Sequence, residues 1–525
     1  MVLVRGRQCR SPTKYRGAGE DTTERNDAAR KETFLHTCMD VPAPHFDLLN
    51  AARQEMIRDG FNPDFPPGTD EQLATIKNRP ASLAQSGIRD LRNLLWSSID
   101  NDSSRDLDQI EVAERTDTGI RVLIGIADVD SDLQVGSPID KHAADQTTSV
   151  YTAIHTFPML PEVLSTDLTS LSENEDRLAI VIEMTVGNDG QISSSDVYRA
   201  LVRNKAQLTY SKVGPWLDGQ SEPPSKLSTA ADLQSQLKLQ DEAAAALRAQ
   251  RYRLGALNFD RVEAQATITD GKVQEITAAQ KTRASDLIED FMVAANEVMA
   301  RTLKQKGVAS IRRVVKSPER WSRIVELAGR YGETLPAQPD SGALNAFLTK
   351  RRAADELHYA DLSLAVLKLM GPGEYVVSTP DSTGDEGHFG LAAHDYTHST
   401  APNRRFADLV TQRLIKAVLA QRPAPYSKDD LTRIAQNCTL KEDAARKVER
   451  AMNKRVAALA FQDRVGESFS AVVTGVTPKG VFVRVLNPPV EGRLMRGEQG
   501  VDVGDKIQVT LLSTDPERGY IDFVR

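Results

Sequence analysis

The pattern of apolar and polar positions changes along the chain. Between residues 86 and 210, the runs RVLIGIADV, RLAIVIEMTV and QISSSDVYRALV are rich in β-branched residues and lie between turn residues, which predicts strands. Farther along, apolar residues recur at helical spacing. This spacing predicts helices over residues 228–254, 284–304, 317–331, 404–420 and 440–462. The two patterns together predict a mixed α+β body over residues 86–462.

The regions that flank this body have other patterns. Residues 39–85 contain the helical stretches AARQEMIRDGF and EQLATIKN on either side of a Pro-Gly break, and they predict a small helical domain, either helix-turn-helix-like or a plain cap. Residues 466–525 contain five short alternating strands separated by Gly, Pro and Asp turns. That pattern predicts a small closed β-barrel, a kind of fold that commonly binds oligonucleotides.

Residues 1–38 have no apolar periodicity. Their basic residues precede the first acid, Glu20, and no apolar stretch has the length of a secretory signal. The composition predicts a disordered basic and polar tail, with a basic arm for nucleic acid as the alternative. Met39 is a second candidate start of the chain.

Composition narrows the class of protein but not its chemistry. The 525 residues are 40% hydrophobic and 26% charged, which excludes collagen, a coiled coil and wholesale disorder. No run reaches the ~20 apolar residues that cross a bilayer. Three scattered cysteines favour a reducing, cytoplasmic location. The formal charge of −7 argues against a protein that coats nucleic acid, but it allows a basic channel inside an acidic exterior.

The segment SSIDNDSSRDLDQIE is the most unusual local feature. Asp100, Asp102, Asp106 and Asp108 are separated by even numbers of residues, so an extended chain would place all four carboxylates on one side. Like charges this close raise one another's pKa unless a cation lies among them. Hard oxygen ligands suit Mg²⁺, Mn²⁺ or Ca²⁺ rather than zinc. The spacing therefore predicts a divalent metal site, with an acidic surface loop as the alternative.

Two further segments carry candidate binding residues. Arg404 and Arg405 precede a predicted helix, where guanidinium groups and the helix N-terminus suit phosphate. Tyr151 precedes the Pro-punctuated loop HTFPMLPEVL and offers a ring for stacking. A solvated arginine pair and a loop that only packs are the alternatives.

Eight segments in one order make the chain resemble the ribonuclease II family. The resemblance to the catalytic RNB domain is carried by RDLRNLLWSSID, DNDSSRDLDQ, IGIADVDSDLQVGSPID, SVYTAIHTFPMLPEVLSTDLTSL, RYRLGALNFD, IEDFMVAAN, HFGLAAHDYTHSTAPNRRFADLVTQRLIKAV and RKVERAMNKR. The tail segments VTGVTPKGVFVRV and VGDKIQVTLL resemble the S-one type of RNA-binding OB fold. The resemblance implies a mixed α/β RNB domain over residues 86–462 and a five-stranded OB barrel over residues 466–525.

The resemblance also implies an activity, namely processive 3′→5′ hydrolysis of RNA to 5′-nucleoside monophosphates by a monomer, in RNA turnover. Mg²⁺ is the implied cofactor, with Mn²⁺ as the alternative. Asp100, Asp106 and Asp108 match the carboxylates that bind metal and activate water. Arg404 matches the arginine that contacts the scissile phosphate.

Substrate contacts are implied in the same way. Tyr151 matches the aromatic residue that orients the 3′-terminal nucleotide, and Glu449 matches a carboxylate near the terminal ribose. Glu289 matches a contact to the RNA backbone. Arg405 and Phe482 are the other expected substrate-binding residues.

Several positions depart from the family pattern. Gln109 replaces one more acid, so either fewer metals bind or Asp102 compensates. Asn403 ends a segment that usually reads Ser-Pro-Ile, and a stacking Phe falls near Ala266. Lys479 replaces an aromatic residue of the barrel. Residues 1–85 lack the strands of two cold-shock barrels, so we expect a more open entrance and digestion of structured RNA from a 3′ overhang.

Two other classes of function remain open at this point. A catalytically inactive RNA-binding protein is suggested by Gln109 and by the altered arginine loop. A metal-dependent phosphodiesterase that acts on DNA or small nucleotides would use the same carboxylates.

Overall fold

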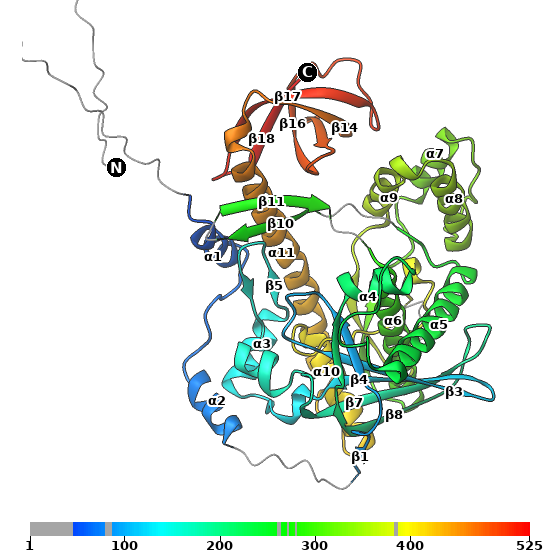
Figure 1. Ribbon diagram of the computed structural model, residues 1–525. Coiled ribbons are helices and arrows are strands. Elements are labelled where there is room, and N and C mark those ends of the chain that lie inside the picture. Colours follow the sequence, from blue (N-terminus) through cyan, green and yellow to red (C-terminus); the bar gives the residue numbers. More distant parts are fainter. Residues whose placement is uncertain (1–45, 79–86, 260–263, 270–271, 279–280, 383–386) are drawn as a thin grey trace, which may run out of the picture. The chain divides into compact units, whose positions relative to one another are not determined.

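The structure is a computed structural model that describes residues 46–78, 87–259, 264–269, 272–278, 281–382 and 387–525 (Figure 1). Within it, Phe46–Arg525 form one compact unit. The predicted tail at residues 1–38 and the candidate start at Met39 lie outside the described residues. Among those described, no helix combines the length and the apolar character that crossing a membrane needs.

A seven-stranded sheet forms the base of the unit, with the strand order β1-β8-β7-β4-β3-β2-β9. Strands β3, β4, β7 and β8 are antiparallel neighbours, whereas β2 and β9 run parallel. Gly119 makes the turn between β3 and β4, because its φ of +151° brings it so close to Val186 O that no Cβ would fit. The strands are β1 (Arg89–Asp90), β2 (Ser97–Asp100), β3 (Gln109–Thr116), β4 (Gly119–Ala127), β7 (Asp176–Val186), β8 (Ile192–Arg203) and β9 (Ala206–Thr209).

Helices and short hairpins complete the α+β body. Helix α5 (Ala231–Arg253) packs on β3 and β4, and α6 (Arg283–Gln305) packs on α5 and β2. The predicted helices over residues 228–254, 284–304, 317–331 and 404–420 are confirmed. The other elements are α3 (Pro138–Gln146), α4 (Tyr210–Leu217), α7 (Trp321–Arg330), β5 (Val150–Tyr151), β6 (Thr156–Phe157), β10 (Ala264–Thr269), β11 (Lys272–Ala278), β12 (Ser310–Val314) and β13 (Glu374–Ser378).

Three helices differ from the sequence prediction. Helix α11 (Lys428–Ala460) starts well before residue 440, at a capping box in which Ser427 and Asp430 bond reciprocally. Helices α8 (Ser341–Ala354) and α9 (Glu356–Met370) were not predicted, because their apolar residues do not form a narrow stripe. They pack with α7 around Trp321 and Ile324 in a core of their own.

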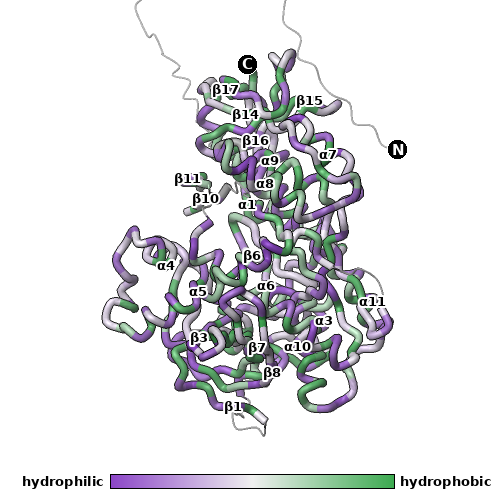
Figure 2. Tube along the Cα trace, turned by 90° about the vertical axis from the view of Figure 1, so that its right-hand side faces the viewer, coloured by the Kyte–Doolittle hydropathy of each residue, from purple (hydrophilic) through white to green (hydrophobic). Residues whose placement is uncertain are grey.

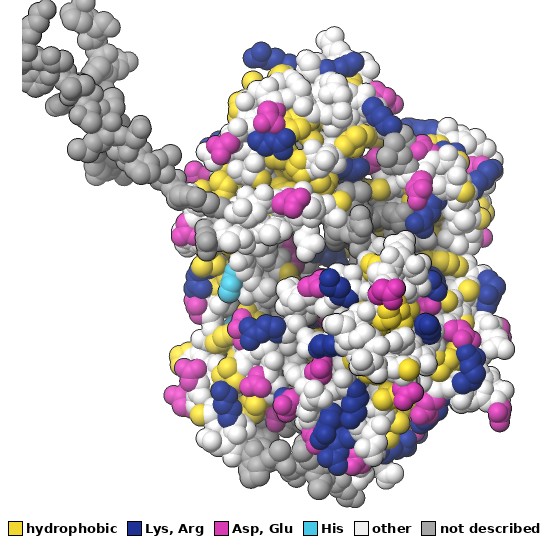
Figure 3. Space-filling view, in the orientation of Figure 1, with side chains coloured by type: hydrophobic (Ala, Val, Ile, Leu, Met, Phe, Trp, Pro, Cys, Tyr) yellow, Lys and Arg dark blue, Asp and Glu magenta, His cyan; other side chains and the backbone are white. Residues whose placement is uncertain are grey.

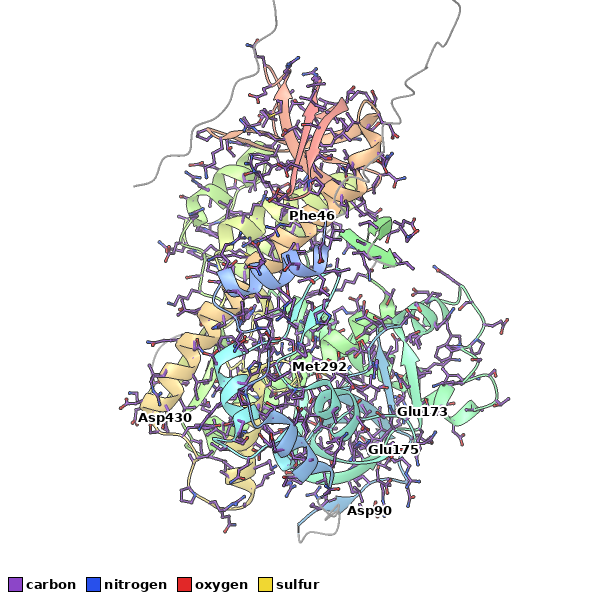
Figure 4. The ribbon with its side chains drawn as sticks, turned by 90° about the vertical axis from the view of Figure 1, so that its left-hand side faces the viewer. Phe46, Asp90, Glu173, Glu175, Met292 and Asp430 are labelled. Carbon is purple, nitrogen blue, oxygen red and sulfur yellow. The ribbon has the colours of Figure 1, made fainter. Side chains whose placement is uncertain are left out.

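The predicted helices of residues 39–85 are present as α1 (Leu48–Arg58) and α2 (Thr69–Lys77). They pack on the catalytic region, since α1 contacts α11 and α2 contacts α3. Leu48 and Met56 share a buried cluster with Val150 and Val448. In Figure 4, Phe46 lies toward the barrel end of α11, far from Asp430 near its start. Helix α1 thus supports the strand that ends at Tyr151.

The predicted five-stranded barrel is confirmed as a closed barrel with the order β14-β15-β16-β18-β17. Val481, Val483 and Val485 are buried inside it, and the residues between them face outward. Figure 2 shows hydrophobic and hydrophilic positions alternating along these strands. The strands are β14 (Ser468–Thr477), β15 (Gly480–Val485), β16 (Val490–Arg496), β17 (Lys506–Asp515) and β18 (Tyr520–Val524).

Helix α10 (Phe406–Leu419) is buried on nearly every side, and its polar residues form ion pairs. Lys416 Nζ lies 2.7 Å from the buried carboxylate of Asp128, which also pairs with Arg199 at 3.0 Å. Arg413 pairs with Asp130 at 2.8 Å. These pairs join α10 to the end of β4.

A buried histidine makes stability sensitive to acid. Burial lowers the pKa of His388 to about 4, and Arg313 contributes. Below pH ~6.5 the unfolded chain binds a proton that the folded chain rejects until about pH 4, so stability falls with pH across this window. We expect His388 to account for a loss on the order of 3 kcal/mol between pH 6.5 and 4.

The measurement is thermal unfolding of the wild type and His388→Asn across this pH range. The Asn oxygen still accepts the hydrogen bond that Leu391 N donates to Nδ1 at 3.1 Å. The variant should lose less stability on acidification. Parallel curves for the two proteins would contradict the assignment.

Candidate active site

The acidic segment connects the end of β2 to the start of β3. Asp100 Oδ1 accepts hydrogen bonds from Asn101 N at 2.7 Å and Ser104 Oγ at 2.8 Å. Asp102 is exposed and accepts from Ser211 Oγ at 2.8 Å, at the start of α4. The expectation that an extended chain gathers all four carboxylates is wrong, because residues 101–104 form a turn in which Ser104 N bonds to Asn101 O.

Asp108 is the most buried of these acids, with 2% of the residue exposed. Its Oδ1 accepts from Asn403 N at 3.2 Å, and its Oδ2 lies 3.4 Å from Arg404 Nε. Burial raises the pKa of Asp108 to about 7; Arg404 opposes this, and the charge of Asp106 adds to it. The backbone is also held, since Ala127 N at the end of β4 donates to Asp108 O at 3.0 Å.

Asp106 connects Asp108 to Asp100 electrostatically. Burial raises the pKa of Asp106, the guanidinium of Arg404 lowers it, and the charge of Asp100 raises it further. Three of the four predicted carboxylates therefore lie within reach of one another and of one arginine. Asp102 is directed toward α4 instead.

The two predicted arginines have different surroundings. Arg404 is 48% exposed at its side chain, so one edge of the guanidinium faces Asp108 and the rest is open to solvent. Arg405 instead pairs with Asp408, with Nη2 2.7 Å from Oδ1 and Nε 2.8 Å from Oδ2. Asp408 also accepts from Ala401 N at 2.8 Å. Arg405 thus holds the loop that presents Arg404, which argues against its predicted role in binding substrate.

Tyr151 lies beside the same charges. Burial raises its pKa to about 12, and the charges that act on it are those of Arg404, Asp106 and Asp108. The residue is still 42% exposed, so part of its ring is accessible. Its backbone N donates to Glu449 Oε1 on α11 at 3.3 Å. The structure therefore brings Tyr151 and Glu449 together at the edge of the carboxylate group.

The other predicted substrate residues lie on separate elements. Glu289 is on α6, where its carboxylate lies 2.9 Å from Lys281 Nζ. Phe482 is half-buried on the outer side of the barrel strand β15, and Lys479 is in the turn before it. Ala266 on β10 packs partly against the core of the barrel.

Sequence reasoning did not assign roles to Asp408, Asn403 and Thr169. Asp408 lies three residues after Arg405 in the first turn of α10, a spacing that is a detectable signal. Asn403 is 1% exposed, and its Oδ1 accepts from Thr169 Oγ1 at 2.8 Å. Only the tertiary structure brings Thr169 beside this loop, so no local pattern reveals that contact.

The donor set fits a hard divalent cation in part. Raised pKa values at Asp106 and Asp108 are what a bound cation would relieve, and their oxygens are the ligands that Mg²⁺ and Mn²⁺ prefer. Mg²⁺ is usually held by one or two carboxylates together with substrate phosphates. In the described part of the chain, no three His, Cys, Asp or Glu side chains are close enough to hold a metal by themselves. Phosphate oxygens or water would have to complete the site.

Two family models match this chain and cover the parts described above. The RNB domain matches residues 88–421, and the RNase II-type exonuclease C-terminal S1 domain matches residues 467–525. The chain therefore belongs to the ribonuclease II and R family of RNB-domain proteins.

Particular relatives carry the name ribonuclease R. The chain is 29% identical to ribonuclease R 1 of Lactococcus lactis over 88% of this chain and 59% of that protein. It is 28% identical to ribonuclease R of Escherichia coli over 87% and 60%. The chain thus spans about three fifths of the length of these relatives. Structures of Mycoplasma genitalium RNase R with single-stranded RNA share the fold, with a TM-score of 0.82, 23% identity, and coverage of 91% of this chain and 78% of that one.

Proposed function

We propose that this protein is a metal-dependent exoribonuclease that hydrolyses RNA from the 3′ end and releases 5′-nucleoside monophosphates. The observation that carries the proposal is the group formed by Asp108, Asp106, Asp100 and Arg404, with Tyr151 and Glu449 at its edge. We further propose that it acts as a monomer in the cytoplasm, on single-stranded RNA and RNA with a 3′ overhang. Figure 3 shows acidic and basic side chains interspersed on one face, which fits a protein that does not coat RNA.

The residues divide the chemistry between them. Mg²⁺ or Mn²⁺ held by Asp100, Asp106 and Asp108 would make a water more acidic and offset phosphate charge. Arg404 is open to solvent on one side, so it offsets negative charge that develops on the phosphate oxygens. Tyr151 and Glu449 hold the terminal nucleotide so that one phosphodiester bond faces the carboxylates. The 2′-OH is the group that distinguishes RNA from DNA.

The deciding experiment uses RNA labelled at its 5′ end, incubated with Mg²⁺, Mn²⁺ or EDTA, with products resolved by length. We expect stepwise shortening from the 3′ end that requires metal. No shortening with either metal would favour the inactive RNA-binding protein that Gln109 suggests. An equal rate on an all-deoxy oligomer would favour a general phosphodiesterase.

Tyr151→Ala is expected to change the length of the final product more than it changes the affinity for RNA. Tyr151 contacts only the last nucleotide in this proposal, whereas affinity is spread over many phosphates. The measurement compares limit products and RNA binding for the wild type, Tyr151→Ala and Tyr151→Phe, which keeps the ring. An unchanged limit product for Tyr151→Ala would mean that this side chain serves only packing.

Structured substrates test the entrance to the site. A 3′-tailed hairpin should be digested into its stem, because no cold-shock barrel is present among the described residues to narrow the path. Opening each step costs on the order of 1–2 kcal/mol. Removing residues 46–85 is a poor probe, since Leu48 and Met56 are buried against α11. Arrest several nucleotides before the stem would indicate that α1 and α2 close the entrance.

A further inference from the structure

Glu111 is a buried acid that the proposed chemistry does not use. It lies on β3, two residues after Gln109, and the residue is 0% exposed. Neither of its carboxylate oxygens has a hydrogen-bond partner among the described residues. A buried carboxylate without a partner is costly, because it loses its hydration and gains no interaction in return. Such a group needs either a proton or a cation.

The surroundings of Glu111 offer acceptors rather than donors. Its strand neighbours are Ser97 on β2 and Ile124 on β4. The side chain of Gln240 on α5 donates to the backbone O of Glu111 at 3.2 Å. Its own Oε1 is another buried oxygen that lacks a partner in the described chain. Three acceptor oxygens without donors therefore belong to Glu111 and its neighbour Gln240.

Glu111 also faces the candidate active site. Strand β2 runs beside β3 from Ser97, opposite Glu111, to Asp100 at its end. Burial raises the pKa of Glu111 well above its ordinary value, and Asp100 is the charge that raises it further. Tyr210, which follows β9, feels the charges of both Asp100 and Glu111. Glu111 therefore lies on the Asp100 side of the carboxylate group.

The sequence around Glu111 gives its position a meaning. Gln109 occupies the place where the family resemblance predicts another acid. Side chains two residues apart on a strand share a face, so Gln109 and Glu111 project to the same side of β3. The chain thus lacks a carboxylate at one position and has a buried, unpartnered one at the next position on that face.

We propose that Glu111 is a further carboxylate of the metal site, supplying beneath Asp100 the negative charge that Gln109 lacks. The inference rests on the proposed function, because it assumes that Asp100 and its neighbours hold a divalent cation. It differs from the expectation that Asp102 compensates, since Asp102 is exposed and bonded to Ser211.

The test is Mn²⁺ binding to the full chain without RNA, followed by electron paramagnetic resonance. Glu111→Gln should weaken Mn²⁺ binding by about tenfold or more. Adding Gln109→Asp to it should restore the affinity to within about threefold of the wild type. The control is Glu114→Gln on the same strand, whose carboxylate lies 2.7 Å from Arg121, and it should change the affinity less than about twofold.

Normal Mn²⁺ binding by Glu111→Gln would overturn the proposal and identify Glu111 as a protonated core residue. Failure of Gln109→Asp to restore binding would overturn it as well. If Glu111→Gln does not fold, Glu111→Leu is the second variant, and the same weakening is expected. RNA hydrolysis by the wild type separates the two proposals. An active wild type with normal binding by Glu111→Gln contradicts only this inference, whereas an inactive wild type contradicts the proposed function.

Discussion

Asp108→Asn is expected to lower the turnover of RNA by at least ~10²-fold while RNA binding persists. The substitution keeps the shape of the side chain but removes the charge that faces Arg404 at 3.4 Å. Binding persists because it is distributed over many phosphates. The measurement is single-turnover cleavage of 5′-labelled RNA with Mg²⁺, together with an RNA-binding titration.

Asp102→Asn is the matched control, since it makes the same change in the same segment. Its carboxylate is exposed and bonded to Ser211, so turnover should change less than about threefold. Near-normal turnover in Asp108→Asn, or an equal loss in both variants, would contradict the site as assembled here.

Asp128→Asn is expected to lower the free energy of unfolding by about 3 kcal/mol, the largest effect on stability that we anticipate. The Asp128 carboxylate is fully buried, 2.7 Å from Lys416 Nζ and 3.0 Å from Arg199 Nη2. Without its charge, a mostly buried ammonium keeps only the carboxylate of Asp130, at 2.8 Å. The measurement is urea unfolding followed by circular dichroism.

Asp196→Asn serves as the control for Asp128→Asn. Asp196 lies on the same sheet and pairs with Arg89 at 3.0 Å, but both side chains are more than half exposed. Exposed pairs contribute little, so this variant should lose less than about 1 kcal/mol. Equal losses in the two variants would mean that burial does not determine the strength of these pairs.

The predictability of the fold followed the strength of the local pattern. The barrel strands alternate apolar and polar residues, as at Val481, Val483 and Val485, so their pattern specified both the strand and its inner face. Helices α8 and α9 lack such a signal, and their burial depends on contacts with α7. The early start of α11 is marked by Ser427 and Asp430, a capping box that periodicity alone does not detect.

The candidate site divides in the same way. The acids Asp100, Asp106 and Asp108 were found from their spacing and from the family resemblance. Their spacing also included Asp102, because parity assumes an extended chain, whereas the turn at residues 101–104 redirects that side chain. The pairing of Arg405 with Asp408 likewise becomes visible only once the loop is folded.

The sequence by itself determined the family, the α+β class, the barrel and the kind of ligand that the acids suit, because these depend on residue type and short-range periodicity. The tertiary structure decided which charges meet. Arg404 and Asp108 are 296 positions apart in the chain, and Tyr151 and Glu449 are 298 apart. Burial of Asp108 and Glu111 depends on every strand and helix around them. Such long-range contacts and the desolvation they produce have no local signal, so only the folded chain reveals them.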